Sequence, residues 1–276
     1  MRPVEQQTIL VTGATDGLGR ALAGELAARG ATVLVHGRSG ERVDDVVREF
    51  GGGARGYVAD FSSLGQVRAL AGAVERDHRR LDLLVNNAGI GSGPRGSGRE
   101  VSEDGYELRF AVNYFASFLL TNLLLPLLRR SAPARIVNVS SAGQAPIDFD
   151  DVMLERGYSG MRAYAQSKLA QILFTFELAE RLRAEGAGVT VNALHPATLM
   201  NTKMVDESYG YTLSTIEDGV EAVLRLAISP DLDGVTGRYF DRLREARPNA
   251  QATETEARAR LWALSEELAG VSTRSA

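Results

Sequence analysis

The sequence predicts an α/β fold, in which one doubly wound sheet of about seven parallel strands carries helices on both faces. Short β-branched runs alternate with longer amphipathic stretches, as a parallel sheet with crossover helices requires. The length of 276 residues suits one large α/β unit better than two domains. No repeat or linker interrupts the alternation. We therefore expect a single domain over residues 1–276.

The spacing of the apolar residues separates the expected strands from the expected helices. The strands are expected at residues 8–12, 32–36, 56–59, 81–86, 135–140, 188–194 and 237–240. The helices are expected at residues 18–29, 41–50, 64–79, 106–130, 161–185, 216–227 and 255–269, and many of them end near a glycine, which favours a left-handed cap. The non-periodic segments 89–98 and 143–160 each follow a strand. Ligands of open α/β sheets lie beyond the carboxyl ends of the strands, so we expect these two segments near the active site.

Composition excludes several kinds of partner. The net charge of -4 gives no electrostatic reason to expect nucleic acid, and the absence of cysteine removes disulfides and thiolate chemistry. The three histidines have no metal-ligand spacing, so no metal is expected. The longest apolar run, residues 115–128, contains polar residues and a proline, and it is shorter than the roughly 18 residues of a membrane helix. We expect a buried helix there, no membrane partner and a cytoplasmic protein.

A glycine-rich turn joins the first strand to an alanine-rich helix. It reads Thr12-Gly13-Ala14-Thr15-Asp16-Gly17-Leu18-Gly19. Glycines let a pyrophosphate approach the backbone N–H groups at the start of a helix, where the helix dipole favours negative charge. The alternative is that the turn is only a tight strand-to-helix connection. Its position at the first such junction favours nucleotide binding.

Further motifs follow in chain order. They are Asp60 after the third strand, Asn86-Asn87-Ala88-Gly89 after the fourth, Asn113 in a helix, Ser140-Ser141 after the fifth, Tyr164-x-x-x-Lys168 in a helix, and His195-Pro196 after the sixth. Together with the glycine turn, this set resembles the short-chain dehydrogenase/reductase family. The 22 residues between Ser141 and Tyr164 resemble the longer connection of its retinol-dehydrogenase-like branch. The resemblance implies a Rossmann-type fold and hydride transfer between a nicotinamide and a carbonyl or alcohol, and it leaves a homo-oligomer open.

The resemblance also implies a set of cofactor-binding residues. They are Gly13, Thr15, Asp16, Gly17, Leu18, Gly19, Arg38, Asp60, Phe61, Asn87, Ala88, Gly89, Tyr164, Lys168, Pro196 and Thr198. One departure is Ala197, which stands where the family has a glycine after the proline.

The end of the second strand bears on which nicotinamide is used. It reads His36-Gly37-Arg38, without the carboxylate that would accept from a ribose 2′-OH and repel a 2′-phosphate. By resemblance, Gly37 occupies the position of that carboxylate, and Arg38 can offer a charged fork to a 2′-phosphate. We therefore expect NADP(H) to be preferred over NAD(H). The alternative is that Arg38 is a solvated loop residue, and Asp16 weighs against the preference because NADP-preferring relatives often carry a basic residue there.

Tyr164 and Lys168 are predicted to do the proton chemistry. Four residues apart on a helix, their side chains share a face, and an ammonium near a phenol favours the phenolate that a general acid–base residue needs. The alternative is an ordinary solvent-facing pair. By resemblance, Ser141 binds the substrate oxygen, with Ser140 as the competing choice, and Asn113 holds a water that links Lys168 to solvent. His195 is expected to be structural or to lie beside the cofactor.

The substrate is expected to be a hydrophobic small-molecule carbonyl compound or alcohol, bound by loops near residues 143–162 and 197–211, with residues 91–98 beside them. The second loop carries Met200, Met204 and two tyrosines, and it suits a mobile lid and a plain surface helix equally. Two other functions are weighed against the oxidoreductase. A non-catalytic nucleotide sensor would be free to lose Ser141, Tyr164 and Lys168, and a nucleotide-sugar epimerase or dehydratase would carry a different glycine spacing.

Overall fold

A single eight-stranded sheet organises the chain. The structure is a computed structural model that describes residues 1–94, 96–202, 204–206 and 210–271. The strand order is β3-β2-β1-β4-β5-β6-β7-β8, and the first seven of these strands are mutually parallel. The Rossmann-type α/β prediction is therefore confirmed. The eighth strand, which pairs antiparallel with β7, was missed because its two residues are too short to show a period.

The strands lie close to their predicted positions. They are β1 (Thr8–Val11), β2 (Thr32–Gly37), β3 (Arg55–Val58), β4 (Leu83–Asn86), β5 (Ala134–Val139), β6 (Val189–His195), β7 (Tyr239–Asp241) and β8 (Arg244–Glu245). The first strands show why the sheet forms. Leu10 packs into the core on one face, whereas Ile9 and Val11 pack into the core on the other. Both faces of the strand are buried, as in parallel sheets generally.

The long helices also match the prediction. They are α1 (Gly17–Ala28), α2 (Gly40–Phe50), α3 (Leu64–Asp77), α5 (Ala116–Arg130), α6 (Gly160–Ala184), α8 (Ile216–Ile228) and α9 (Thr255–Ala269). Shorter helical segments are η1 (Val4–Gln6), α4 (Leu108–Phe110), the π-helical turn η2 (Ala111–Phe115), η3 (Pro230–Leu232) and η4 (Ala250–Thr253). Thus the helix expected over residues 106–130 begins two residues later and contains a π turn.

Side-chain caps set where several helices begin. Asp16 Oδ1 accepts a hydrogen bond of 2.8 Å from the Gly17 N–H at the start of α1. Ser39 caps α2, and Thr215 forms a capping box with Asp218 at the start of α8. Each cap satisfies a backbone donor that the first helical turn leaves without a partner.

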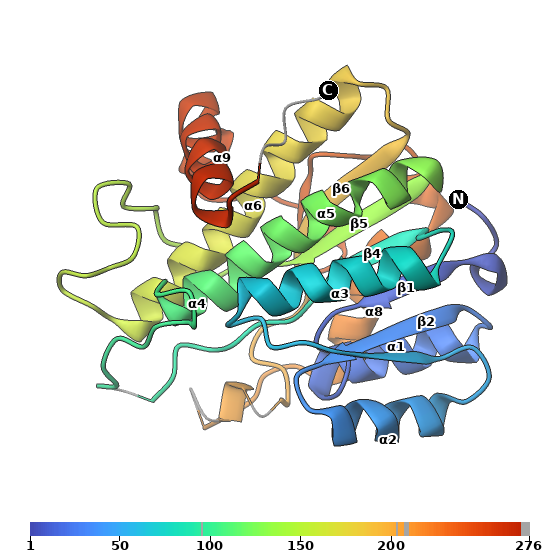
Figure 1. The fold of residues 1–276 in the computed structure, drawn as a ribbon. Helices are drawn as coiled ribbons and strands as arrows, with labels where there is room; N and C mark the ends of the chain where they lie inside the picture. Colours follow the sequence, from blue (N-terminus) through green and yellow to red (C-terminus); the bar gives the residue numbers. More distant parts are fainter. Residues whose placement is uncertain (95, 203, 207–209, 272–276) are drawn as a thin grey trace.

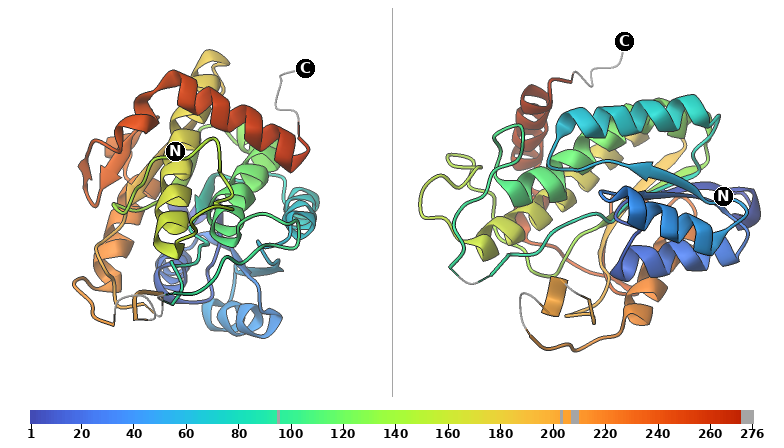
Figure 2. Two further views of the ribbon diagram at one scale, coloured as in Figure 1. Left: turned by 90° about the vertical axis from the view of Figure 1, so that its left-hand side faces the viewer. Right: turned by 60° about the horizontal axis from the view of Figure 1, so that its bottom comes forward.

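Two helical layers cover the sheet. The core on one face is built with α3, α5, α6 and α9, and the core on the other face with α1, α2 and α8. Figures 1 and 2 show the sheet between these layers, with α9 lying across α6. The C-terminal helix is held there by Trp262, whose ring is stacked with Phe174 and meets Phe118 edge to face.

One helical run among the described residues is long and apolar enough to cross a membrane. It is Leu108–Arg130, with a mean hydropathy of 1.6, and 78% of its most apolar window is buried inside the structure. The run packs against α3 and α6 in the centre of one layer. The prediction of a buried helix over residues 115–128 is confirmed.

The parallel register brings the carboxyl ends of the strands to one edge of the sheet. Val11 lies opposite both Val35 and Val85, and Asn86 lies opposite Asn138. The glycine turn, the segment after β4, the serines after β5 and the loop after β6 therefore meet at this edge, where ligands of doubly wound sheets bind.

Candidate active site

The three glycines of the turn after β1 are required for different reasons. A Cβ atom on Gly13 would lie 2.9 Å from Ala88 Cα, and one on Gly19 would lie 2.2 Å from the Gly13 carbonyl oxygen. Gly17 instead has a φ of +49°, a backbone conformation that side-chain-bearing residues rarely adopt. The backbone of the turn is thus packed tightly against Ala88 and against itself, and its N–H groups lie at the start of α1.

Polar contacts to the end of β4 hold the turn in place. Thr12 Oγ1 accepts hydrogen bonds from the backbone N–H groups of Asn87 and Ala88, at 2.9 and 3.0 Å. The Asn87 side-chain amide donates to the carbonyls of Thr12 and Gly13, at 2.9 and 3.2 Å. The amide N–H groups of Asn87, predicted for the cofactor, are therefore engaged in shaping the turn.

His36 supports the same turn from β2. Its Nδ1 accepts a hydrogen bond of 3.2 Å from the Gly13 N–H, and its Nε2–H donates to the Ala59 carbonyl at 3.1 Å. Phe61 stacks on the ring with a centroid distance of 4.3 Å. Burial lowers the pKa of His36 to about 4, so the ring is neutral at physiological pH. Sequence reasoning missed this role, because its only signal is a polar residue in an apolar strand.

Phe61 and Leu18, both predicted at the cofactor site, are almost fully buried. Phe61 is covered by His36, and Leu18 belongs to the core between α1 and α8. What Leu18 can offer a ligand is therefore its backbone. Asp60 lies at the rim of the site, where its Oδ1 accepts a hydrogen bond of 2.8 Å from the Ser62 N–H.

Charges near the end of β2 are arranged around Arg38 and Arg42. Arg38 is exposed, and it makes no hydrogen bond or ion pair with any other residue that the structure describes. Arg42, in the first turn of α2, lies 2.8 Å from Asp16 Oδ2 and donates to the Thr15 carbonyl at 3.2 Å. The carboxylate that counted against a phosphate site is thus paired with a cation. Sequence reasoning missed Arg42, because the pairing joins residues 26 positions apart.

Gly37 leaves no room for a side chain. A Cβ atom there would lie 2.5 Å from Thr15 Cγ2 and 3.1 Å from Val43 Cγ2. A carboxylate at this position would require Thr15 and α2 to move. We call the turn formed by Gly13, Gly17 and Gly19 the glycine cradle. A dinucleotide fits this edge of the sheet, with its pyrophosphate at the glycine cradle and the start of α1, and its ribose at the strand end that carries no side chain.

Lys168 is buried beneath the other end of the site. Its Nζ donates to the Val139 carbonyl at 3.0 Å and to Gln171 Oε1 at 3.1 Å. It also lies 5.8 Å from the centre of the Tyr164 ring. Burial lowers the pKa of Lys168 to about 8. Gln171, one turn further along α6, is a partner that sequence reasoning missed.

The two serines after β5 have different environments. Ser140 Oγ donates to the Lys168 carbonyl at 2.7 Å, so this hydroxyl ties β5 to α6. Ser141 Oγ accepts from the Gly143 N–H at 3.0 Å. A Cβ atom on Gly143 would lie 3.5 Å from Ser141 Oγ and 3.9 Å from Tyr164 Cε1, so the hydroxyl and the phenol ring both lie beside Gly143. Geometry favours Ser141 over Ser140 as the substrate-facing residue.

Asn113 lies in the π turn η2 and is fully buried. Its Oδ1 accepts from the Ile90 N–H at 2.7 Å, and its Nδ2 donates to the Ile90 carbonyl at 3.1 Å and to Ser167 Oγ at 2.9 Å. A Cβ atom on Gly89 would lie 3.1 Å from Asn113 Oδ1 and 3.6 Å from Lys168 Nζ. Asn113 therefore positions the segment after β4 beside Lys168. Its water-mediated link to Lys168 stays a prediction.

His195 ends β6 directly before Pro196 and near Thr198, which are both predicted to bind the cofactor. Its Nε2 lies 3.1 Å from Thr198 Oγ1, which also accepts from Arg242 at 3.3 Å. Burial lowers the pKa of His195. The ring is thus buried and engaged with Thr198, in keeping with a structural place beside the cofactor segment, where Pro196 follows directly.

The loop predicted over residues 197–211 is closed at its base. The Leu213 N–H donates to the Leu199 carbonyl at 2.9 Å, and the Asn201 N–H donates to the Ser214 carbonyl at 3.2 Å. Residues 203 and 207–209 of this loop lie outside the described residues. Tyr211 and, just beyond the loop, Leu213 expose 57% and 67% of their surface, so this part of the chain presents apolar groups to solvent.

Comparison with known proteins identifies the family. Residues 7–210 match the family model described as short chain dehydrogenase. This chain belongs to the short-chain dehydrogenase family. The enzyme is therefore an oxidoreductase, and the matched range contains the ordered motifs from Gly13 to Pro196. Among the described residues, no group of three or more His, Cys, Asp or Glu side chains could hold a metal ion.

Relatives refine this placement. The dehydrogenase is 38% identical to retinol dehydrogenase 13 of Mus musculus over 287 residues, an alignment that covers 96% of this chain and 84% of that protein. It belongs to the retinol-dehydrogenase-like branch, as the long connection before Tyr164 predicted.

Solved structures share the fold. An uncharacterized protein from Mycobacterium paratuberculosis has a TM-score of 0.80 and 32% identity, covering 98% of this chain and 96% of its own. A 3-ketoacyl-(acyl-carrier-protein) reductase from Brucella melitensis, complexed with NADH, has a TM-score of 0.71 and 26% identity, with coverage of 86% and 97%. The RhlG/NADP complex of Pseudomonas aeruginosa has a TM-score of 0.70 and 28% identity, with coverage of 87% and 97%. Similar folds thus bind either nicotinamide.

Proposed function

We propose that this dehydrogenase transfers a hydride between NADP(H) and a hydrophobic carbonyl compound or alcohol, with Tyr164 as the general acid–base residue. One arrangement carries the proposal. The Ser141 hydroxyl and the Tyr164 ring both lie beside Gly143 after β5, Lys168 Nζ lies 5.8 Å from the centre of that ring, and the glycine cradle lies along the same edge of the sheet. A nucleotide lying along this edge from the cradle would bring its reactive end toward Tyr164.

The chain's own residues account for the proton. In reduction, the Tyr164 hydroxyl gives its proton to the carbonyl oxygen, and the Ser141 hydroxyl donates a hydrogen bond to the same oxygen as it gains negative charge. The Lys168 ammonium favours the phenolate that remains. The nicotinamide, when bound, supplies or accepts the hydride. In oxidation of an alcohol, the Tyr164 phenolate takes the proton instead.

The NADP(H) preference rests on the charges at the end of β2. Arg38 makes no hydrogen bond or ion pair with any other residue that the structure describes. Arg42 is paired with Asp16, and this pairing reduces the repulsion that the Asp16 carboxylate would exert on a phosphate beside Arg38. Gly37 has no space for a carboxylate. An exposed guanidinium suits a 2′-phosphate because its N–H groups form a planar fork.

Replacing Arg38 with alanine tests this preference. A hydrogen bond to a charged group contributes about 1.5–3 kcal/mol, so the Arg38→Ala variant should raise KM for NADPH roughly 10- to 100-fold while KM for NADH changes little. Steady-state kinetics with both cofactors measure this. Arg48→Ala is the matched control, since Arg48 is an exposed arginine of α2 paired with Asp45. An enzyme that prefers NADH before any substitution would contradict the proposal.

The proposed substrate class rests on the loops and on the relatives. Exposed apolar side chains beside the site include Met161 at the start of α6, with Tyr211 and Leu213 on the loop after β6. The curated relatives are named for retinol. We therefore propose a long apolar alcohol or aldehyde of the retinoid kind.

The proposed oxidoreductase activity is tested by following the absorbance of the reduced nicotinamide cofactor as it is consumed or formed. The purified enzyme is given NADPH or NADH with all-trans-retinal, hexanal, an aromatic ketone and a quinone. Consumption of NADPH with retinal, faster than with hexanal, is expected. Failure to oxidise either reduced cofactor with any carbonyl, together with failure to reduce NADP⁺ with retinol, would refute the proposed function.

A further inference from the structure

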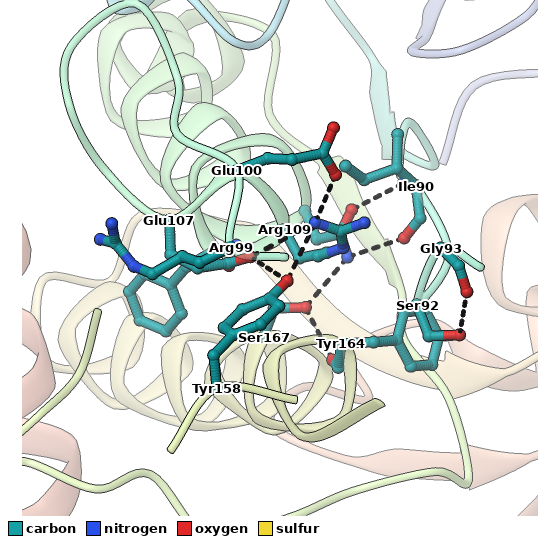
Figure 3. A network of polar contacts seen from close by, with 12 residues as sticks. Ile90, Ser92, Gly93, Arg99, Glu100, Glu107, Arg109, Tyr158, Tyr164 and Ser167 are labelled. Atoms are coloured by element: carbon teal, nitrogen blue, oxygen red, sulfur yellow. Dashed lines mark hydrogen bonds and ion pairs between the residues drawn. The ribbon is translucent and has the colours of Figure 1, made fainter. Parts of the chain in front are cut away.

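A buried arginine lies at the centre of a polar cluster outside the residues assigned to the proton chemistry. Arg109 of α4 is 3% exposed. Its Nη1 lies 2.8 Å from Glu100 Oε2 and 3.7 Å from Glu107 Oε1, and it donates to the Tyr158 hydroxyl at 3.0 Å. Figure 3 shows the guanidinium lying among these three side chains.

The cluster satisfies its own charges. The Tyr158 hydroxyl donates to Glu107 Oε1 at 3.2 Å, and Glu107 Oε2 accepts from the Phe110 N–H at 2.7 Å. Glu107 is 1% exposed, whereas the Glu100 side chain is 56% exposed. Burying a charged pair is costly unless its remaining hydrogen bonds are satisfied, so the cluster holds one geometry. Tyr158 completes it from the long connection between Ser141 and α6.

The cluster grips the segment that follows β4. Arg109 Nε donates to the Gly91 carbonyl at 3.3 Å, and a Cβ atom on Gly93 would lie 2.5 Å from Arg109 Nη2. On its other side, a Cβ atom on Gly160 would lie 2.1 Å from the Ser92 carbonyl oxygen. The segment from Gly91 to Gly93 is therefore packed between Arg109 and the first turn of α6.

This segment and this helical turn both adjoin the proton-transferring residues. Asn113 holds Ile90 by two hydrogen bonds directly before the segment, and it also holds Ser167 of α6. Tyr164 lies one turn beyond Gly160 on the same helix. A shift of the Gly91–Gly93 segment would therefore change the space in front of Tyr164.

We propose that Arg109 and Tyr158, with Glu107, are positioning residues that fix the wall of the substrate site and thereby select long, bulky carbonyl substrates over small ones. This inference rests on the proposed function. None of the three residues needs to contact the reacting atoms. They act by holding the Gly91–Gly93 segment against the first turn of α6. This position depends on the Tyr158 hydroxyl, which bridges Arg109 and Glu107.

The Tyr158→Phe variant tests the inference, because it keeps the ring and removes only the hydroxyl that joins Arg109 to Glu107. The change removes the hydrogen bonds to Arg109 and Glu107, and one net hydrogen bond corresponds to roughly a three- to tenfold change, so KM for all-trans-retinal should rise by at least that factor. The kcat for hexanal should stay within about twofold, since a loosened wall leaves the proton chemistry in place. Tyr57→Phe is the matched control, because Tyr57 is a partly buried tyrosine of β3 whose hydroxyl contacts His78 and Asp77.

A second readout does not depend on turnover. Hydrogen–deuterium exchange of residues 89–94 should be faster in Tyr158→Phe than in the wild type and in Tyr57→Phe. Arg109→Lys should show an intermediate rise in KM for retinal, and Arg109→Gln a larger one, because lysine keeps the charge that balances Glu107 but loses the fork.

Two results would overturn the inference. One is an unchanged KM for retinal, or an unchanged exchange rate of residues 89–94, in Tyr158→Phe. The other is an equal loss of activity toward retinal and hexanal with a lowered Tm, which indicates a purely structural role. If the wild type reduces no carbonyl at all, the proposed function fails, whereas unchanged exchange in Tyr158→Phe still refutes the positioning role by itself.

Discussion

The Tyr164→Phe variant is expected to lose kcat by roughly 10²- to 10⁴-fold in both directions of the reaction, the range that positioned acid–base groups contribute. Phenylalanine keeps the ring that lies 5.8 Å from Lys168 Nζ but removes the proton that reduction needs. Steady-state kinetics with retinal and with retinol measure the loss.

Cofactor binding separates a chemical defect from a folding defect in this variant. When NADPH is titrated with the protein and its fluorescence is followed, Tyr164→Phe should bind NADPH with an affinity close to that of the wild type, because the glycine cradle is untouched. Tyr57→Phe serves again as a control at the far edge of the sheet. Activity of Tyr164→Phe within tenfold of the wild type would remove the proton-transfer role.

The Lys168→Met variant is expected to lose activity. Its stability relative to that of the wild type is expected to rise as the pH is lowered. Burial lowers the pKa of Lys168 from 10.5 to about 8. Between these values the unfolded chain binds more protons than the folded enzyme, so the wild type becomes more stable as the pH rises from 8 to 10.5. Below pH 8 the cost of burying the ammonium is complete. That cost amounts to about 3 kcal/mol at full extent.

Urea unfolding of both proteins between pH 7 and 10.5 measures this difference. The free energy of unfolding of Lys168→Met minus that of the wild type should be largest at pH 7 and should shrink by about 3 kcal/mol by pH 10.5. The variant leaves the Val139 carbonyl and Gln171 Oε1 without their donor, a cost of about 1–3 kcal/mol each at most that does not change with pH over this window. A difference that stays constant with pH would show that the ammonium is not held buried.

Such a variant also separates stability from function at one residue. Under the proposed mechanism, burying the Lys168 ammonium costs stability, and its charge favours the Tyr164 phenolate. Loss of kcat in Lys168→Met with unchanged stability at pH 7 would mean that the hydrogen bonds to Val139 and Gln171 offset the burial of the charge.

Local features of the sequence were enough to predict the strands and the long helices, and to name the residues proposed for the site. Leu10, with Ile9 and Val11 on the opposite face, shows the continuous apolar run of a doubly covered strand, and the glycine turn has a spacing that can be read directly. The motif residues from Gly13 to Pro196 meet because parallel strands end at one edge, which the predicted topology already requires. The two-residue strand β8 and the π turn at Asn113 have no such local pattern.

By itself, therefore, the sequence determined the α/β class and the order of the elements, and it predicted the Ser141, Tyr164 and Lys168 constellation. Only the tertiary structure decided that Ser140 ties β5 to α6 while Ser141 lies beside Gly143, that Arg42 pairs with Asp16, that His36 supports the glycine turn, and that Tyr158 closes a cluster around Arg109. The physical reason is that periodicity and motif spacing report short-range geometry along the chain. The partner of a buried polar or charged group comes from a distant segment, and packing selects it.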